Sequence, residues 1–265
     1  MVVQHNLSAM NTNRQMGVVT SALQKSTEKL SSGYKINRAG DDAAGLSISE
    51  KMRSQIRGLN KASDNAQDGI SLIQVAEGAL NETHSILQRM NELATQAAND
   101  TNTSVDRQSI KDEIEQLNEE LDRISTTTQF NKQDLLTGGF SGKLQVGALE
   151  GQTMDVKISL AVSANGLKVS AVEVSTNAKA GAAMQSIQDA IESVSKQRSK
   201  LGAIQNRLEH TINNLDTNAE NTQAAESRIR DTDMADEMVQ YSKNNILSQA
   251  GQSMLTQANQ QTQGV

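Results

Sequence analysis

Mostly apolar residues in the first half of the chain mark the seam positions of a helix, with a spacing that alternates between three and four. The repeat is unbroken and comprises Ile56, Leu59, Ser63, Ala66, Ile70, Ile73, Glu77, Leu80, His84, Leu87, Asn91 and Ala94. This period is typical of a helix that packs along one stripe against a partner helix. The pattern predicts a single helix from about residue 43 to about residue 99, with a length of about 80 Å at 1.5 Å per residue.

Two later segments carry the same helical spacing. The first comprises Ile110, Ile114, Leu117, Leu121 and Ile124, and it follows a turn predicted at residues 99–103. The second comprises Met184, Ile187, Ile191, Val194, Arg198, Leu201, Gln205, Leu208, Ile212 and Leu215, and it continues to Ile229 with a polar seam. Because such helices bury their stripes against one another, we expect a mainly α fold with a coiled-coil-like bundle.

The period changes to two near residues 140–175. Leu144 and Val146, and then Met154, Val156, Ile158 and Leu160, alternate with polar residues as half-buried strands do. Turn sequences at Glu150-Gly151 and Asn165-Gly166 favour a β-hairpin element. The valines between Val169 and Val174 predict a further strand.

Both chain ends carry weak helical stripes. The first 40 residues predict a helix that is interrupted by Gly17 and closes near Gly33, with Leu7, Met10, Leu23 and Leu30 as its stripe. The last stretch, residues 231–265, is rich in Gln and Asn, and its apolar content is Met234, Met238, Leu247, Met254 and Leu255. We expect the two end helices to pair side by side. Such weakly apolar helices gain little from one partner, so we also expect neighbouring copies of the chain to bury them.

Composition and charge exclude several classes of function. The chain has no Pro, no Cys and no Trp, and its four aromatic residues are Tyr34, Phe130, Phe140 and Tyr241. Absence of proline suits long helices, and scarcity of rings argues against an aromatic-lined ligand pocket. The net charge of −6 comes without a basic cluster, which argues against nucleic-acid binding. Neither a membrane-spanning apolar run nor a cleavable signal peptide is visible.

No catalytic, cofactor or metal site can be assembled from the sequence. His5, His84 and His210 are dispersed, whereas a metal needs several ligands that converge on one point. The pair Asp41-Asp42 precedes a helical segment, which favours a helix cap over paired catalytic carboxylates. We therefore expect a protein that is not an enzyme.

Several segments together resemble the bacterial flagellins. The segment that begins Leu30-Ser31-Ser32-Gly33 and continues through Ile36-Asn37-Arg38-Ala39-Gly40-Asp41-Asp42-Ala43-Ala44-Gly45-Leu46 is similar to the signature of that family. Further similar segments lie, in the family's order, at residues 66–80, 87–96, 129–131, 144–148, 201–208 and 253–260. The resemblance therefore extends along nearly the whole chain.

The resemblance implies a subunit that polymerises with itself into the extracellular flagellar filament. It implies an inner-tube domain at residues 1–42 plus 220–265, and a rod-like outer-tube domain at residues 43–219. The variable outer domain of most flagellins is missing, which predicts a minimal flagellin. The implied partners are an export chaperone, the filament cap and the hook-associated junction proteins. The implied route is the flagellar secretion apparatus, without a cleaved signal peptide.

The resemblance also implies functional residues. Positions that contact neighbouring protofilaments, and the innate immune sensor Toll-like receptor five on free monomers, correspond to Gln88, Arg89, Glu92, Leu93, Gln96 and Glu113. Arg89 offers a planar fork of five donors, and Leu93 offers a neighbouring apolar anchor. The residues expected to drive polymerisation are Leu7, Met10, Leu23, Leu30, Met238, Leu247, Met254 and Leu255.

Two alternatives remain compatible with long helices. A hook–filament junction protein shares the terminal helices, and a chemoreceptor cytoplasmic hairpin shares the heptads but has no strands in the middle. Flagellins also continue beyond the position of Val265 with a short apolar tail, so we expect residues to be missing there.

Overall fold

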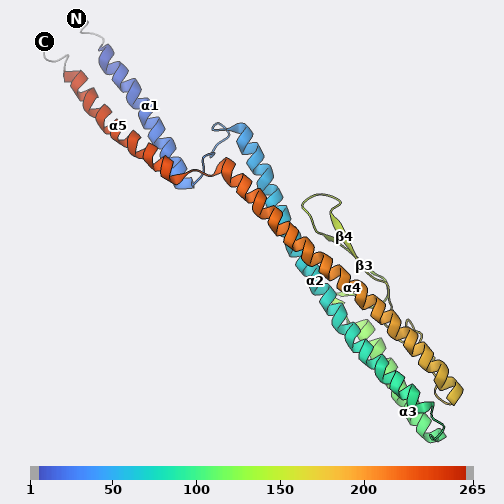
Figure 1. Cartoon of the computed structure of the whole chain (residues 1–265). Coiled ribbons are helices and arrows are strands. Elements are labelled where there is room, and N and C mark those ends of the chain that lie inside the picture. The colour runs from blue at the N-terminus through green and yellow to red at the C-terminus, as the bar shows by residue number, and fades with distance from the viewer. Residues whose placement is uncertain (1–5, 261–265) are drawn as a thin grey trace. The chain divides into compact units, whose positions relative to one another are not determined.

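The structure is a computed structural model that describes residues 6–260, and it is mainly helical (Figure 1). The helices are α1 (Leu7–Ser32), α2 (Ala43–Ala97), α3 (Ser104–Thr127), α4 (Asn177–Arg230) and α5 (Met234–Gln260). The short strands are β1 (Gln129–Phe130), β2 (Gln133–Asp134), β3 (Phe140–Gln145) and β4 (Thr153–Ile158). The predicted fold class is confirmed. The predictions for His5 and for the chain end at Val265 fall outside the described residues.

The chain divides into two compact units. The first unit consists of Met1–Ile56 with Glu220–Val265, and the second unit consists of Arg57–Ala219. Helices α2 and α4 each contribute residues to both units, because each of them runs through a unit boundary without a break.

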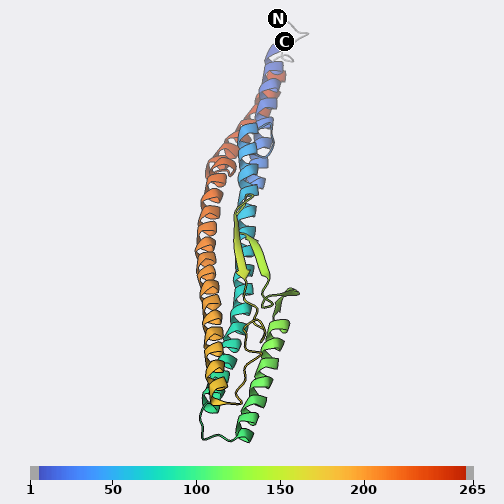
Figure 2. The same cartoon turned by 90° about the vertical axis from the view of Figure 1, so that its right-hand side faces the viewer.

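In the first unit, α1 and α5 lie side by side and antiparallel, as Figures 1 and 2 both show. The predicted pairing of the terminal helices is therefore confirmed. The predicted interruption at Gly17 is wrong, since α1 runs unbroken from Leu7 to Ser32. One glycine costs a helix only about 1 kcal/mol relative to alanine, which is too little to break a helix of this length. The helix ends at Gly33, whose φ of 77° gives a left-handed cap.

The two connectors of the first unit are tied to each other. The Lys35 amide donates to the Arg230 carbonyl at 2.6 Å, and the Thr232 amide donates to the Gly33 carbonyl at 3.0 Å. The Arg230 guanidinium lies 4.6 Å from the centre of the Tyr34 ring and 3.0 Å from a Glu50 carboxylate oxygen. These contacts hold the α1–α2 connector against the α4–α5 connector.

Asp41 and Asp42 act on the backbone before α2, as the sequence predicted. Asp42 Oδ1 accepts the Gly45 amide at 2.9 Å, which satisfies a donor in the first turn. Asp41 Oδ2 accepts the amides of Arg38 and Asn37, and these hydrogen bonds lower the pKa of Asp41. Both carboxylates thus accept backbone hydrogen bonds that stabilise the loop and the start of α2.

The second unit is a helical bundle of α3 with parts of α2 and α4 (Figure 2). Its continuous core contains Ile73, Leu80 and Leu87 of α2, Ile114 and Leu121 of α3, and Ile187 and Leu201 of α4, all nearly inaccessible to solvent. Polar seam positions find partners on the facing helix. Ser63 donates to Asp216 at 3.0 Å, and Arg198 lies 3.7 Å from Glu77. The predicted bundling of heptad helices therefore appears in this unit.

The antiparallel β3–β4 hairpin packs on α2. Its register runs from Phe140 opposite Ile158 to Gln145 opposite Thr153. In β4 the alternate residues Met154, Val156 and Ile158 are buried, so the predicted alternation is confirmed. The hairpin approaches α2 closely at two glycines: a Cβ on Gly69 would lie 2.3 Å from Leu144 Cδ1, and one on Gly58 would lie 2.8 Å from Ala148 Cβ.

The further strand predicted between Val169 and Val174 is wrong. The chain turns sharply there, because the Val169 and Ser170 amides both donate to the Ala164 carbonyl, and Lys168 has a φ of 59°. Val169 and Val174 are fully buried, so their apolar character reflects packing of an irregular segment against the bundle. The pair β1–β2 was not predicted.

The close approach at Gly58 gives a matched test of hairpin docking. We expect Gly58→Ala to lower the free energy of unfolding by about 1–3 kcal/mol, because the Ala148 methyl and backbone must move away. Gly78 lies on the same helix with nothing within 4 Å of a built Cβ. Gly78→Ala is expected to stabilise by about 0.5–1 kcal/mol through helix propensity alone. Urea denaturation monitored by circular dichroism measures the stability of both variants. Equal stabilisation by Gly58→Ala and Gly78→Ala would contradict close packing of the hairpin on α2 at Gly58.

Candidate assembly surfaces

The seam between α1 and α5 joins a largely apolar stripe of α1 to mostly small and polar side chains of α5. Seam positions repeat with alternating spacing of three and four in both helices, and they are half-buried or buried. In α1 they are Ala9, Thr12, Met16, Val19, Leu23, Ser26 and Leu30, and in α5 they are Glu237, Tyr241, Asn244, Ser248, Gly251, Leu255 and Ala258. Because most of these positions are only half-buried, the pair is held more weakly than the fully buried core of the second unit.

Three contacts fix the register of this pair. Lys29 Nζ lies 3.4 Å from Glu237, the Asn6 side-chain amide donates to the Ala258 carbonyl at 2.9 Å, and a Cβ built on Gly251 would lie 3.8 Å from Met16. Between these contacts the register places Val19 opposite Ser248 and Leu23 opposite Asn244. The apolar side chains of α1 therefore face polar residues of α5.

Large apolar side chains are exposed on the outer faces of both helices. In α1 the exposed fractions are 74% for Leu7, 63% for Met10 and 62% for Val18. In α5 the exposed residues are Met234, Met238, Val239, Ile246, Leu247 and Met254, at 44–67%. At 100° per residue the three α1 positions and Val239 and Ile246 of α5 lie opposite the seam. Met238, Leu247 and Met254 flank the seam, and Met234 continues its spacing at the start of α5. The terminal pair thus carries many of its large apolar residues outside the seam, available to other chains.

The structure divides the predicted polymerisation residues between these two faces. Leu7, Met10, Met238, Leu247 and Met254 lie on the exposed outer faces. Leu23, Leu30 and Leu255 lie on the seam inside one chain. Val18, Val239 and Ile246 were not predicted, although helical angles measured from an assumed seam would have placed them on the exposed faces.

The predicted receptor and protofilament positions form an exposed patch on α2 and α3, with one exception. Gln88, Arg89, Glu92, Gln96 and Glu113 are exposed. Arg89 Nε donates to Glu113 at 2.9 Å, and Arg89 also lies 3.3 Å from Glu92. The hydrogen bond with Glu113 is the main cause that raises the pKa of Arg89. The guanidinium therefore joins α2 to α3, and its three nitrogens contact Glu113 and Glu92 while the side chain stays about half exposed.

Leu93 is the exception, because it is only 2% exposed and belongs to the core. The prediction that it offers an apolar anchor on the surface is wrong. Since α2 packs against more than one partner, its buried face is wider than a single heptad seam and includes Met90, Leu93 and Ala97. The patch on α2 and α3 is therefore polar and charged.

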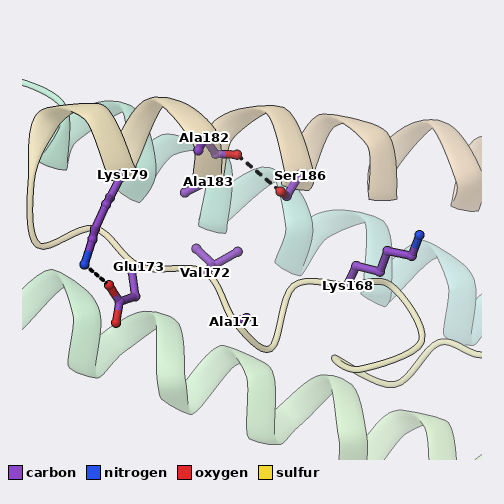
Figure 3. Close-up of a pocket in the computed structure, with 8 residues that line it drawn as sticks. All are labelled: Lys168, Ala171, Val172, Glu173, Lys179, Ala182, Ala183 and Ser186. Atoms are coloured by element: carbon purple, nitrogen blue, oxygen red, sulfur yellow. Dashed lines mark hydrogen bonds and ion pairs between the residues drawn. The ribbon is translucent and has the colours of Figure 1, made fainter.

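A hollow of about 300 Å³ lies between α4 and the segment 168–173 (Figure 3). Lys179 forms an ion pair with Glu173 at its rim. The only hydroxyl in its lining, on Ser186, donates to the Ala182 carbonyl of its own helix. No base contacts this serine within the described residues, so the hollow holds no activated nucleophile.

In residues 6–260 no helix combines the length and the apolar character needed to cross a membrane.

A helical bundle without an assembled catalytic or metal site in the described residues, and a terminal helix pair with exposed apolar side chains, are typical of a structural subunit that associates with copies of itself. Residues 3–141 match the model of the bacterial flagellin N-terminal helical region, and residues 184–265 match that of the C-terminal helical region. A flagellin of Halalkalibacterium halodurans is 56% identical over 267 residues, which cover 100% of this chain and 98% of that protein. The chain belongs to the flagellin family, whose members are structural subunits of the extracellular flagellar filament and not enzymes.

Solved structures agree with this assignment. The crystal structure of a Bacillus cereus flagellin is 33% identical with a TM-score of 0.52, and the match covers 62% of this chain and 94% of that one. A Vibrio parahaemolyticus protein described as flagellar hook-associated has a TM-score of 0.63 at 15% identity, covering 72% and 100% of the two chains. The second likeness shows a shared fold alone. The junction-protein alternative thus has no support from sequence identity, whereas the flagellin assignment has it along the whole chain.

The family matches also locate the missing insertion. Only residues 142–183 lie between the two matched regions, and they hold most of the β-hairpin and the start of α4. No large variable domain separates the halves, so the prediction of a minimal flagellin is confirmed.

Proposed function

We propose that the outer faces of α1 and α5 form the contacts between copies that build the inner tube of the filament. In this proposal residues 1–42 and 220–265 make the inner-tube domain, and residues 43–219 make the outer-tube domain. The observation that supports it is the exposure of large apolar side chains of α1 and α5 outside their seam. Burial of such side chains yields roughly 25 cal/mol per Å², and it is repeated at every neighbour in a helical lattice.

The weakly held pair also suits assembly from exported monomers. The chain leaves the cell through the flagellar secretion apparatus without a cleaved signal peptide, and an export chaperone covers the apolar outer face of α5. At the growing tip, beneath the cap and beyond the hook-associated junction proteins, the terminal helices order against neighbouring copies. Apolar burial there offsets the entropy of ordering.

Removal of α5 tests the assembly proposal. We expect the full chain to extend from sonicated filament seeds, and the chain lacking residues 231–265 to remain monomeric because it lacks both the seam partner and the outer face of α5. Negative-stain electron microscopy and sedimentation measure filament formation. The heptad core of the second unit should keep the truncated chain helical, which circular dichroism checks. Filaments from the truncated chain at the same monomer concentration would falsify the proposal.

A second proposed function is recognition of the free monomer by Toll-like receptor five through the patch on α2 and α3. The supporting observation is that Arg89, held by Glu113 and Glu92, presents an oriented guanidinium on an exposed surface. The same surface contacts a neighbouring protofilament in the filament, so the receptor would meet it on monomers only.

Arg89→Ala is expected to weaken binding of monomer to the receptor ectodomain at least tenfold. The substitution removes the charge-assisted donors from the centre of the patch. Arg123→Ala is the matched control, because Arg123 is a similarly exposed arginine paired with Glu120 on α3. Surface plasmon resonance with immobilised ectodomain measures both variants. Unchanged affinity of the Arg89 variant rules out this patch as the receptor site.

A further inference from the structure

A basic stripe runs along the exposed side of α4 in the second unit. Residues 193–208 contain four basic residues and no acidic one. Lys196, Lys200 and Arg207 are exposed and follow helical spacing, with Ala203 between the last two. Lys196 pairs with Glu192 at 2.6 Å, whereas no carboxylate within the described residues pairs with Lys200 or Arg207.

The stripe borders a groove of about 430 Å³ between β4 and α4. Its lining is Asp155, Lys157, Ser159, Gln197, Lys200, Ala203 and Ile204. Lys157 and Lys200 bring positive charge to the groove, whose one carboxylate, on Asp155, lies 3.9 Å from Lys157. Gln197 is only 4% exposed and donates to the Lys157 carbonyl at 3.3 Å, which holds β4 against α4 beside the groove. The groove is therefore a fixed feature with an excess of positive charge.

An acidic stripe of matching length lies on α3. Residues 111–122 contain six acidic residues and one lysine. Asp112, Glu115, Glu119 and Asp122 are exposed and repeat with spacing of three and four. This stripe is about 15 Å long and the basic one about 16 Å, at 1.5 Å per residue. Within one copy no ion pair joins the two stripes among the described residues.

We infer that the acidic stripe of α3 in one copy docks against the basic stripe and groove of α4 and β4 in a second copy. The inference rests on the proposed assembly function and names a lateral contact for the outer-tube domain. The contact joins two different surfaces of the unit, as a heterologous contact does, and a heterologous contact that does not close into a ring propagates from copy to copy. Charge complementarity of this kind selects the register of the contact and opposes wrong ones.

A charge swap tests the contact. Glu115→Lys with Glu119→Lys reverses the acidic stripe, and Lys200→Glu with Arg207→Glu reverses the basic one. We expect each double variant to remain a helical monomer and to raise the critical concentration for growth from wild-type seeds at least tenfold. The variant with all four substitutions restores opposite charges across the contact. It is expected to return to within threefold of the wild-type critical concentration when grown on its own seeds.

A matched control separates this contact from net charge. Asp68→Lys with Glu82→Lys raises the net charge as much as reversal of the acidic stripe does, on exposed positions of α2 that have no ion-pair partner within the described residues. The control should grow like wild type. The inference is overturned if the control loses filament growth as much as the double variants do. It is also overturned if both double variants grow like wild type, or if the variant with all four substitutions does not recover growth. Growth of the wild-type chain with failure of rescue leaves the terminal-helix proposal standing, whereas failure of the wild-type chain to grow counts against that proposal itself.

Discussion

Replacement of Met238, Ile246 and Met254 by glutamine will leave a folded monomer that no longer forms filaments at normal monomer concentrations. These side chains are 50%, 67% and 58% exposed in the single chain. Ile246 lies opposite the seam, and Met238 and Met254 lie on either side of it. If neighbours bury them, each contributes about 1–2 kcal/mol, somewhat less than full burial of such a side chain. Loss of all three raises the critical monomer concentration about 100-fold or more, since about 1.4 kcal/mol corresponds to a factor of ten.

The measurement is the soluble monomer concentration at equilibrium with seeded filaments, determined by sedimentation. Glutamine keeps the length and the helix propensity of the side chains, so monomer helicity should not change. The matched control replaces the same three residues by leucine, which keeps the face apolar and should polymerise. An unchanged critical concentration of the glutamine variant excludes this face of α5 from the contacts between copies.

Local periodicity was sufficient to predict the bundle but not the terminal pair. In α2 the apolar seam from Leu59 to Ala94 repeats so regularly that period, length and partner stripe followed from the sequence. In α5 apolar and polar residues are spread round the helix, so no stripe marks the seam. The structure places small and polar residues such as Ser248 and Gly251 on the seam and leaves Ile246 outside. A seam is visible in a sequence as an apolar stripe, and α5 has no such stripe.

The other differences between the predictions and the structure also arise from tertiary packing. Local sequence patterns do not specify which neighbours an element packs against. Leu93 belongs to the signature of a surface segment, yet it is buried because α2 contacts partners on two sides. Val169 and Val174 suggested a strand, yet the Ala164 carbonyl accepts two amides and turns the chain. Arg89 and Glu113 were both predicted for one site. Their direct ion pair depends on how closely α2 and α3 approach, which periodicity does not specify.

The polar seam leads to a second large effect, in the opposite direction. We expect Asn244→Leu with Ser248→Leu to stabilise the α1–α5 pair by about 2–3 kcal/mol, because both half-buried positions lie opposite the apolar Leu23 and Val19 in the register. Amide protection of α1 and α5 in the free monomer should therefore rise by more than tenfold, as measured by hydrogen exchange.

A more stable pair should also lower the critical concentration for seeded growth, by about tenfold or more. The proposed mechanism orders the terminal helices during assembly, so a pair that is ordered beforehand loses less entropy when it docks. Asn245→Leu with Gln249→Leu is the control, because it adds the same apolar bulk one position away from the seam, where protection of the monomer should change less. A higher critical concentration despite stronger protection has one physical reading: the α1–α5 seam must open for a subunit to dock, and its polar residues keep that opening easy.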